Sequence, residues 1–422
     1  MKGIEYLKGL APWSGSFSGE WSLRLMHQLV SGLGDPHRAF PSIHVTGTNG
    51  KGSISVAIAS ILAKGGRKVG LTTSPHLRSI NERIVIDGHP IGDELLNECG
   101  EAVQRAAVGL AGEPTFFEGI TAAAFLAFKL AKVDFGVVEV GLGGRLDATN
   151  VLPAPLVSVI ATIAFDHEQI LGDSLGRIAR EKAGIFKVGS QLVVGEVGSE
   201  AYEEIEQAAL ALNSRINVFG REYRVVGVSG DVCRFDGFGC SFEFRPTLQG
   251  AHQVHNMGVA IAAAILAGAT VDECIRGVNS VVWPGRLERF RWCERDVIID
   301  AAHNPAGIES LTSFLKARGI RPECAFGAIE TKNWRSMVGA LSPYVTKWAI
   351  LEPDFPKAVP AHEIVEFLSC SGISSTNFGR CYTDFREALS QGRGPVLIAG
   401  SIYLIGIIRS LLSNRDEPLW RK

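Results

Sequence analysis

Short apolar runs alternate with Ala-rich stretches of helical spacing between about residues 42 and 299. The runs at 43–45, 135–140 and 156–163 are rich in β-branched residues, whereas residues 54–64 have the spacing of a helix. Apolar strands separated by helices are typical of a parallel sheet that helices cover on both faces. We therefore expect an α/β fold for this part of the chain.

Residues 221–244 follow a different pattern. Val, Phe and Arg alternate there, and Gly237 and Gly239 interrupt the alternation. Strand-like alternation around a glycine-containing turn indicates an antiparallel hairpin. We expect a small antiparallel hairpin region attached to the main sheet.

The strand and helix pattern restarts near residue 284. Strands at 297–300 and 396–400 and a helix at 306–317 predict a smaller, Rossmann-like α/β domain. A chain of 422 residues also exceeds what one hydrophobic core normally serves. The expected domains are residues 1–283 and residues 284–422.

The composition limits the classes of partner. A net charge of -2 and a pI of about 6.6 give no reason to expect nucleic acid or an acidic membrane surface. The 8 cysteines form no CxxC pair, which favours reduced thiols over disulfides or a zinc site. The first residues contain no apolar signal core, and no uncharged apolar run reaches the roughly 20 residues that span a bilayer. We expect a cytoplasmic monomer with small-molecule partners, without nucleic acid and without a membrane.

A glycine-rich segment, residues 44–53 (HVTGTNGKGS), runs from a strand into a helix. Glycines let the main chain turn tightly and direct its N–H groups at phosphate oxygens, and the helix N-terminus adds partial positive charge. Lys51 can reach the outer phosphates of a nucleotide, and the Ser53 hydroxyl would lie near a bound Mg²⁺. The alternative is a turn without a ligand, which has no need of a lysine between two glycines. The first domain is therefore expected to be P-loop ATPase-like.

Six blocks give the chain its family resemblance. They are GTNGKGS (47–53), TSPHL (73–77), EVGLGGRLDATN (139–150), EKAGI (181–185), PGR (284–286) and DAAHNP (300–305). In this order they resemble the folylpolyglutamate and dihydrofolate synthase family of the Mur ligase superfamily. The resemblance implies an ATP-dependent ligase that adds glutamate to a folate-type carboxylate.

Several residues match the family's nucleotide contacts and catalytic positions. The ATP contacts that the resemblance implies are Thr48, Asn49, Gly50, Lys51, Gly52, Ser53, Asn256, Arg286 and Asp300. The catalytic positions that it implies are Lys51, His167, Lys182 and His303.

A metal site is expected where two strands end. Glu139 ends a buried apolar strand at the carboxyl edge of the sheet, where a carboxylate is costly unless it is paired or metal-bound. The alternative is an ion pair with Arg145 or Lys51. His167 alone would as often be a core histidine. The resemblance implies metal ligation by Ser53, Ser74, Glu139 and His167. Mg²⁺ prefers oxygen ligands, so an imidazole suggests tolerance of Mn²⁺.

Lys182 lies in a short predicted helix that Gly184 closes. By itself it would most often be a surface lysine paired with a carboxylate. In the family that the chain resembles, the matching lysine is carbamylated, which converts a cation into an anionic oxygen ligand. A carbamate on Lys182 is therefore implied by the resemblance.

The acceptor side of the site is expected in two segments. Phe116 and Phe117 offer a stacking face for a flat heterocycle, although such a pair is more often core; the following helix is expected to start near Thr121. The resemblance implies pterin-side contacts from Thr115, Phe116, Phe117, Glu118, Leu146, Asp147 and Ala148. Asp147 would accept hydrogen bonds from the amino-pyrimidine edge.

Two segments depart from the family pattern. Residues 21–25 (WSLRL) replace a Gly-Leu-Glu-Arg motif, and residues 330–333 (ETKN) replace an Asp-Lys-Asp motif. The acceptor therefore stays open between dihydropteroate and reduced folates. Two other functions are weighed: a Mur-type ligase for another acid and amine, against which the TSPHL and EVGLGGRLDATN blocks argue, and a nucleotide-dependent switch without ligase activity.

Overall fold

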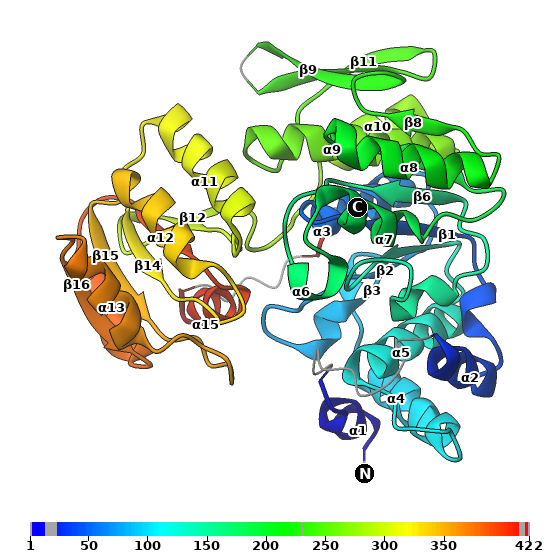
Figure 1. Cartoon of the computed structure of the whole chain (residues 1–422), viewed down its shortest axis with the longest axis horizontal. Helices are drawn as coiled ribbons and strands as arrows, with labels where there is room; N and C mark the ends of the chain where they lie inside the picture. Colours follow the sequence, from blue (N-terminus) through cyan, green and yellow to red (C-terminus); the bar gives the residue numbers. More distant parts are fainter. Residues whose placement is uncertain (1, 13–22, 230, 413–417, 421–422) are drawn as a thin grey trace. The chain divides into compact units, whose positions relative to one another are not determined.

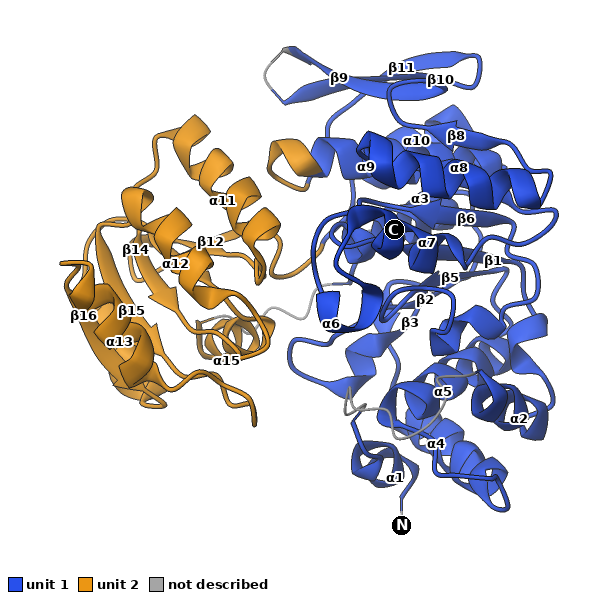
Figure 2. Ribbon diagram, in the orientation of Figure 1, with its two compact units in different colours: residues 1–247, 253–282, 418–422 blue, residues 248–252, 283–417 orange. Residues whose placement is uncertain are grey.

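The computed structural model describes residues 2–12, 23–229, 231–412 and 418–420. These form two compact units (Figure 2). Unit 1 comprises Met1–Thr247, Gln253–Val282 and Pro418–Lys422, and unit 2 comprises Leu248–His252 and Trp283–Glu417. The predicted domains, 1–283 and 284–422, differ from these units at residues 248–252 and 283, which belong to unit 2, and at residues 418–422, which belong to unit 1. At the end of the chain, Trp420 pairs with Val281 in an isolated bridge of unit 1.

Unit 1 is built on an eight-stranded sheet in the order β4-β3-β2-β5-β1-β6-β7-β8 (Figure 1). Strands β2, β5, β1, β6, β7 and β8 run parallel, and β3 and β4 add an antiparallel edge. The strands are β1 (Ser42–Thr46), β2 (Val69–Thr72), β3 (Ile84–Ile86), β4 (His89–Pro90), β5 (Phe135–Glu139), β6 (Val157–Ile160), β7 (Gln191–Val194) and β8 (Ile216–Val218).

Helices pack against this sheet. They are α1 (Gly3–Gly9), α2 (Arg24–Gly32), α3 (Lys51–Lys64), α4 (Asp93–Ala107), α5 (Phe116–Ala131), α6 (Glu168–Leu171), α7 (Leu175–Ala183), α8 (Ser199–Ala211), α9 (Ala251–Leu266) and α10 (Val271–Val278). Short 3-10 turns are η1 (Pro36–Arg38), η2 (Ile80–Arg83) and η3 (Ala148–Val151).

Two helices lie on the same face of the sheet. Val138 packs in the core that contains α5, and Ile160 packs in the core that contains α7. His44 pairs in register with Val138, and Thr46, two residues on, pairs with Ile160, so both apolar side chains point to one face. The loop after β5 lies beside α7, because the Arg145 N–H donates to the Glu181 carbonyl at 2.8 Å.

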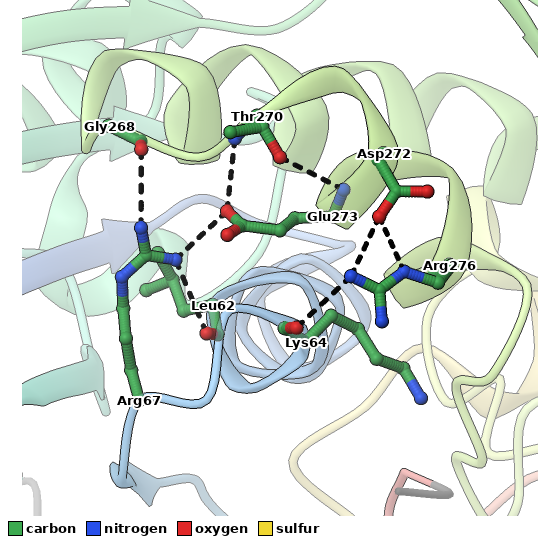
Figure 3. A network of polar contacts seen from close by, with 8 residues as sticks. All are labelled: Leu62, Lys64, Arg67, Gly268, Thr270, Asp272, Glu273 and Arg276. Atoms are coloured by element: carbon green, nitrogen blue, oxygen red, sulfur yellow. Dashed lines mark hydrogen bonds and ion pairs between the residues drawn. The ribbon is translucent and has the colours of Figure 1, made fainter.

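Helix α3 carries the phosphate-loop segment at its start and is enclosed by the fold, because all its residues from Gly52 to Leu62 are buried. A charged network fixes its other end (Figure 3). The Arg67 guanidinium donates to Glu273 Oε2 at 2.9 Å and to the carbonyl oxygens of Leu62 and Gly268 at 3.4 and 3.3 Å. These bonds tie the end of α3 to the start of α10.

Two sequence expectations need correction. The expected hairpin at 221–244 is a separate three-stranded antiparallel sheet of β9 (Tyr223–Ser229), β10 (Val232–Gly237) and β11 (Cys240–Phe244). The helix expected near Thr121 begins at Phe116, because Thr115 and Glu118 form a capping box that satisfies main-chain N–H groups at the helix start.

Unit 2 has a six-stranded sheet in the order β12-β13-β17-β14-β15-β16, in which β12 and β13 are antiparallel and the remaining pairs are parallel. Its strands are β12 (Glu288–Trp292), β13 (Arg295–Ile299), β14 (Glu323–Phe326), β15 (Lys347–Leu351), β16 (Ser375–Gly379) and β17 (Val396–Ala399). Its helices are α11 (Pro305–Arg318), α12 (Trp334–Leu341), η4 (Ser342–Tyr344), α13 (Ala361–Cys370), α14 (Tyr382–Gln391) and α15 (Ile402–Leu412).

The architecture confirms the predicted α/β class, with a larger N-terminal and a smaller C-terminal sheet. No described helix has the length and apolar character needed to span a membrane. The 8 cysteines are all free thiols.

Candidate active site

The phosphate-loop segment joins the end of β1 to the start of α3. Gly47 and Gly50 have φ values of 149° and 87°, in the region that favours glycine. The Thr48 main-chain N–H donates to the Thr162 carbonyl at 2.8 Å, and that of Asn49 donates to Thr162 Oγ1 at 3.1 Å. These bonds fasten the loop to the chain after β6, so its shape exists before any ligand binds.

Asn256 lies directly against this loop. A Cβ placed on Gly50 would come within 2.5 Å of Asn256 Oδ1, so only glycine fits there without displacement. Asn256 is buried in α9, and its Nδ2 donates to Gln253 Oε1 at 3.0 Å. The structure thus brings the predicted ATP contact Asn256 to the loop from more than 200 positions later in the chain.

Lys51 and Lys182 meet at the same loop. Lys51 Nζ donates to the carbonyl oxygens of Gly47 and Thr48 at 3.0 and 3.1 Å, and Lys182 Nζ donates to Gly47 O at 3.0 Å. Lys182 is 4% exposed. It is therefore not the surface lysine that its sequence context alone favours.

The environment of Lys182 favours the neutral amine. Burial and, to a smaller extent, the nearby Lys51 charge lower its pKa from 10.5 to about 7, although Asp166 and Asp147 act in the opposite direction. A neutral amine is the form that reacts with carbon dioxide. The structure therefore supplies the condition that a carbamate requires.

Glu139 and Ser74 meet at the carboxyl edge of the sheet. The Ser74 main-chain N–H donates to Glu139 Oε2 at 3.0 Å, and Glu139 is 5% exposed. Arg145, one of the two partners weighed for Glu139, pairs with Glu181 at 2.9 Å. Ser53, also buried, lies in the first turn of α3.

The donors in this region suit Mg²⁺ in kind. A buried carboxylate and serine hydroxyls provide the hard oxygen ligands that Mg²⁺ prefers. Within the described residues, no three His, Cys, Asp or Glu side chains are close enough together to hold a metal by themselves. A bound ion would therefore depend on hydroxyl, water and phosphate oxygens in addition to Glu139.

His167 is placed by an unusual main-chain conformation. Its φ of 52° lies in the left-handed region, at the position before α6. Its side chain is 43% exposed, and Nε2 is 3.8 Å from Asp166 Oδ1. The strand before it ends at Ile160, earlier than the apolar run at 156–163, because residues 161–164 leave the sheet to bind the phosphate loop.

The predicted pterin segment has structural roles of its own. Thr115 Oγ1 accepts from the Glu118 main-chain N–H at 3.3 Å, and Glu118 Oε2 accepts from the Thr115 N–H at 2.8 Å. Phe116 lies beneath the Arg83 guanidinium, whose carbon is 5.0 Å from the ring centroid. Arg83 Nε also donates to His76 Nδ1 at 2.8 Å. Arg83 and His76 were not among the predicted site residues.

The second predicted acceptor segment, residues 146–148, lies in the loop after β5. Asp147 is buried and accepts the Leu142 N–H on Oδ2 at 2.8 Å and the Thr149 N–H on Oδ1 at 3.0 Å. Burial raises the pKa of Asp147, and these hydrogen bonds oppose the rise. Ala148 belongs to the core beside α5, and Leu146 is half-buried.

A buried histidine, which the sequence analysis did not single out, lies behind Asp147. Thr149 Oγ1 donates to Asp147 Oδ1 at 2.5 Å and lies 2.8 Å from His44 Nε2. Because the Thr149 hydroxyl proton is already used, the His44 Nε2–H is the donor of the second bond. Burial lowers the pKa of His44 to about 3, so the ring is neutral. The only sequence signal was a histidine inside an apolar strand.

In unit 2, Asp300 and His303 follow β13. Asp300 Oδ1 accepts from the Ala302 N–H and Oδ2 from the Leu287 N–H, both at 2.9 Å. His303 Nδ1 is 2.8 Å from the Ala301 carbonyl, so Nδ1 carries the proton and Nε2 is the acceptor nitrogen. Asn304 caps α11, because its Oδ1 accepts the Gly307 N–H at 2.8 Å.

Of the two segments that depart from the family pattern, the structure describes the second fully and the first only in part. Trp21 and Ser22 lie outside the described residues, and Arg24 begins α2. Residues 330–333 form a turn in which the Glu330 N–H donates to the Lys357 carbonyl at 2.9 Å. Asn333 then caps α12 by accepting the Ser336 N–H at 3.3 Å.

Comparisons with known proteins agree with this geometry. The Mur ligase middle domain matches residues 45–264, and the Mur ligase glutamate ligase domain matches residues 285–402. The chain is 35% identical over 410 residues to the dihydrofolate synthase/folylpolyglutamate synthase of Bacillus subtilis, which covers 92% of this chain and 94% of that protein.

Solved structures with the same architecture contain nucleotides. Folylpolyglutamate synthase of Mycobacterium tuberculosis, complexed with ADP and AMPPCP, superposes with a TM-score of 0.85 at 31% identity over 94% of this chain and 96% of that one. FolC of Escherichia coli, in complex with DHPP and ADP, gives a TM-score of 0.86 at 28% identity over 97% and 96%.

Proposed function

Since this chain belongs to the folylpolyglutamate and dihydrofolate synthase family of Mur ligases, and is therefore an ATP-dependent ligase, we propose that it joins L-glutamate to dihydropteroate, to reduced folates or to both. The observation that carries the proposal is the pair of amino groups, from Lys51 and Lys182, on the Gly47 carbonyl of a preformed phosphate loop. Such a loop receives the outer phosphates of a nucleotide.

The proposed reaction passes through an acyl phosphate. An oxygen of the acceptor carboxylate attacks the γ-phosphorus of ATP, and ADP leaves. The amine of glutamate then attacks the acyl carbon, the C–O bond to phosphate breaks, and the amide forms. Lys51 stabilises charge on the phosphate oxygens as it develops. The main-chain N–H groups at the start of α3 orient the phosphates.

Mg²⁺ supplies charge neutralisation on the phosphates when bound, and we assign Ser53, Ser74, Glu139 and His167 as the residues that would hold it. The buried Glu139 and Ser53, and the Ser74 N–H that donates to Glu139, support this assignment. His167 is the one nitrogen donor, so Mn²⁺ is proposed as an accepted substitute. Thr48, Asn49, Gly50 and Gly52 shape the phosphate site, and Asn256, Arg286 and Asp300 complete nucleotide binding.

Lys182 and His303 have separate proposed roles. The lowered pKa of Lys182 supports a carbamate there, which would place an anionic oxygen beside the phosphates. The tautomer of His303 leaves Nε2 as the ring nitrogen able to accept the proton that the attacking amine loses. Phe116, Phe117 and Asp147 are proposed to contact the flat ring of the acceptor. The capping box of Thr115 and Glu118 fixes the start of the helix that carries Phe116 and Phe117, and the Leu142 and Thr149 N–H groups hold Asp147.

The rival functions make different predictions. A ligase for cell-wall precursors would incorporate glutamate with such an acceptor and with no pteroate or folate. A nucleotide switch would hydrolyse ATP without regard to any carboxylate. The relatives named as folate enzymes favour the proposed ligation of glutamate to dihydropteroate or reduced folates over both rivals. We also propose that domains 1–283 and 284–422 act within a single chain as a monomer, which sedimentation of the active enzyme would test.

The experiment that tests the proposal follows the oxygen of the acceptor. Dihydropteroate labelled with ¹⁸O in its carboxylate is incubated with ATP, Mg²⁺ and glutamate. We expect one label in inorganic phosphate for each amide formed, with ADP as the nucleotide product. Lys51→Met, which keeps the side-chain stem and removes the charge, should abolish ADP formation. AMP as product, or unlabelled phosphate during productive ligation, would contradict the proposal.

A further inference from the structure

Arg286 lies in a main-chain segment that two carboxylates hold. The Gly285 N–H donates to Glu288 Oε2 at 2.9 Å, and the Leu287 N–H donates to Asp300 Oδ2 at 2.9 Å. The residues on both sides of Arg286 have positive φ, 71° at Gly285 and 45° at Leu287. A left-handed conformation at leucine persists only where its surroundings determine it.

Glu288 is in turn held from another element. Arg409, in α15, donates from Nε to both carboxylate oxygens, at 3.0 and 2.9 Å. The two side chains are 8% and 19% exposed, so the ion pair lies largely away from water. Removing either partner of such a buried ion pair leaves the other charge buried and uncompensated. The carboxylate that fixes Gly285 therefore depends on Arg409.

The side chain of Arg286 contrasts with its main chain. Across the ranges that the structure describes, no hydrogen-bond or ion-pair partner reaches the Arg286 guanidinium, although the residue is half-buried. A guanidinium has five N–H donors and normally finds an acceptor when water is limited. The main chain is thus fixed on both sides while the charged group remains available for an anionic ligand.

We propose that Glu288 and Arg409 are positioning residues for nucleotide binding, which hold the 285–287 segment so that Arg286 is preorganised for the phosphates of ATP. The inference rests on the proposed role of Arg286 as an ATP contact. Preorganisation matters because a guanidinium that must first be ordered loses part of its binding free energy to that ordering. Neither Glu288 nor Arg409 touches the nucleotide in this proposal.

The test measures the dissociation constant of the nonhydrolysable analogue AMPPCP with Mg²⁺ by calorimetry. Arg286→Ala should weaken binding about tenfold, of the order of one charge-assisted hydrogen bond. Glu288→Gln should weaken it to a similar extent. The double variant should bind no more weakly than Arg286→Ala alone, because both changes remove the same contact. In ligation assays, Glu288→Gln should raise KM for ATP with a smaller effect on kcat, and Arg409→Lys should retain more affinity than Arg409→Met.

A second ion pair in the same unit provides the matched control. Arg295 NH2 contacts Glu323 Oε2 at 2.6 Å, with side chains 2% and 28% exposed. Glu323→Gln should lower the melting temperature as Glu288→Gln does, yet leave the affinity for AMPPCP unchanged. A purely structural role of Glu288 would instead make the two variants behave alike.

Three outcomes would overturn the inference: unchanged affinity in Glu288→Gln, additive losses in the double variant, or unchanged affinity in Arg286→Ala. Failure of wild-type protein to bind AMPPCP would instead contradict the proposed function itself. If Glu288→Gln does not fold, amide hydrogen exchange in Arg409→Lys gives a second measurement. Faster exchange at Gly285 and Leu287 than in wild type is expected, and unchanged exchange there would overturn the inference.

Discussion

Lys51 and Lys182 donate to the same acceptor, the carbonyl oxygen of Gly47, at 3.0 Å each. Two full positive charges at one carbonyl repel each other, and only Lys182 is deeply buried. Burial and the charge of Lys51 both lower the pKa of Lys182 and so favour its neutral form. The structure therefore places a largely neutral amine beside Lys51 at this carbonyl.

The lowered pKa of Lys182 predicts a pH dependence of stability. In the unfolded chain the pKa is 10.5, and in the folded protein it is about 7. Between these values the unfolded state binds the additional proton, so the free energy of unfolding rises with pH. This contribution has a slope of up to about 1.4 kcal/mol per pH unit between roughly pH 8 and 10. Urea unfolding at several pH values, in buffer free of bicarbonate, measures it.

Lys182→Met is the comparison for this measurement. The variant lacks the titrating group, so the difference in unfolding free energy between wild type and variant should change in favour of wild type as the pH rises. A difference that stays constant from pH 7 to pH 10 would contradict the lowered pKa.

A carbamate on Lys182 should make activity depend on bicarbonate. Protein depleted of carbon dioxide should lose ligation activity and recover it when bicarbonate is added, because the neutral amine is available near pH 7. Lys182→Ala should be inactive and partly rescued by a small carboxylic acid that replaces the carbamate oxygen atoms. Active protein with an unmodified Lys182 by mass spectrometry, in the presence of bicarbonate, would exclude the modification.

Gly50→Ala should disrupt the phosphate loop. The new Cβ would lie 2.5 Å from Asn256 Oδ1, and the φ of 87° disfavours any side chain. We expect affinity for AMPPCP to fall by at least about tenfold, as for loss of a preorganised phosphate site. Gly66→Ala is the control: its φ is 75° but nothing lies within 4 Å of the added Cβ. It should cost about 1 kcal/mol of stability and leave affinity unchanged.

Thr115→Ala should shorten α5 at its start. The variant removes the acceptor of the Glu118 N–H and should lower the free energy of unfolding by about 1 kcal/mol. Thr115→Ser keeps the hydroxyl and should retain most of that stability. Chemical denaturation of the three proteins measures the effect. Equal stability of wild type and Thr115→Ala would show that the capping box is not needed.

Arg67→Ala should destabilise the end of α3, since three acceptors lose their donor (Figure 3). With Arg67 25% and Glu273 12% exposed in their side chains, we expect a loss of about 1–2 kcal/mol. Arg276→Ala removes a neighbouring pair whose side chains are 52% and 73% exposed, and should cost about 0.5 kcal/mol or less. Equal losses of stability for Arg67→Ala and Arg276→Ala in thermal unfolding would contradict this expected difference.

The sequence determined the features that depend on neighbouring residues. Glycines and a lysine in 47–53 predicted a phosphate loop, and apolar runs predicted strands at the places of β1, β5, β6, β13 and β17. The six contiguous blocks identified the family, which the comparisons show. These conclusions were accessible because each signal lies within a short stretch of chain.

Only the tertiary structure decided which distant side chains meet. Lys182 reaches a carbonyl 135 positions away, His44 reaches Thr149 across 105, and Arg409 reaches Glu288 across 121. No local pattern encodes such contacts, because they depend on how helices pack against the sheets. The same packing sets burial, and burial sets the pKa of Lys182. Thus the residue types were readable from the sequence, whereas their protonation and their partners required the fold.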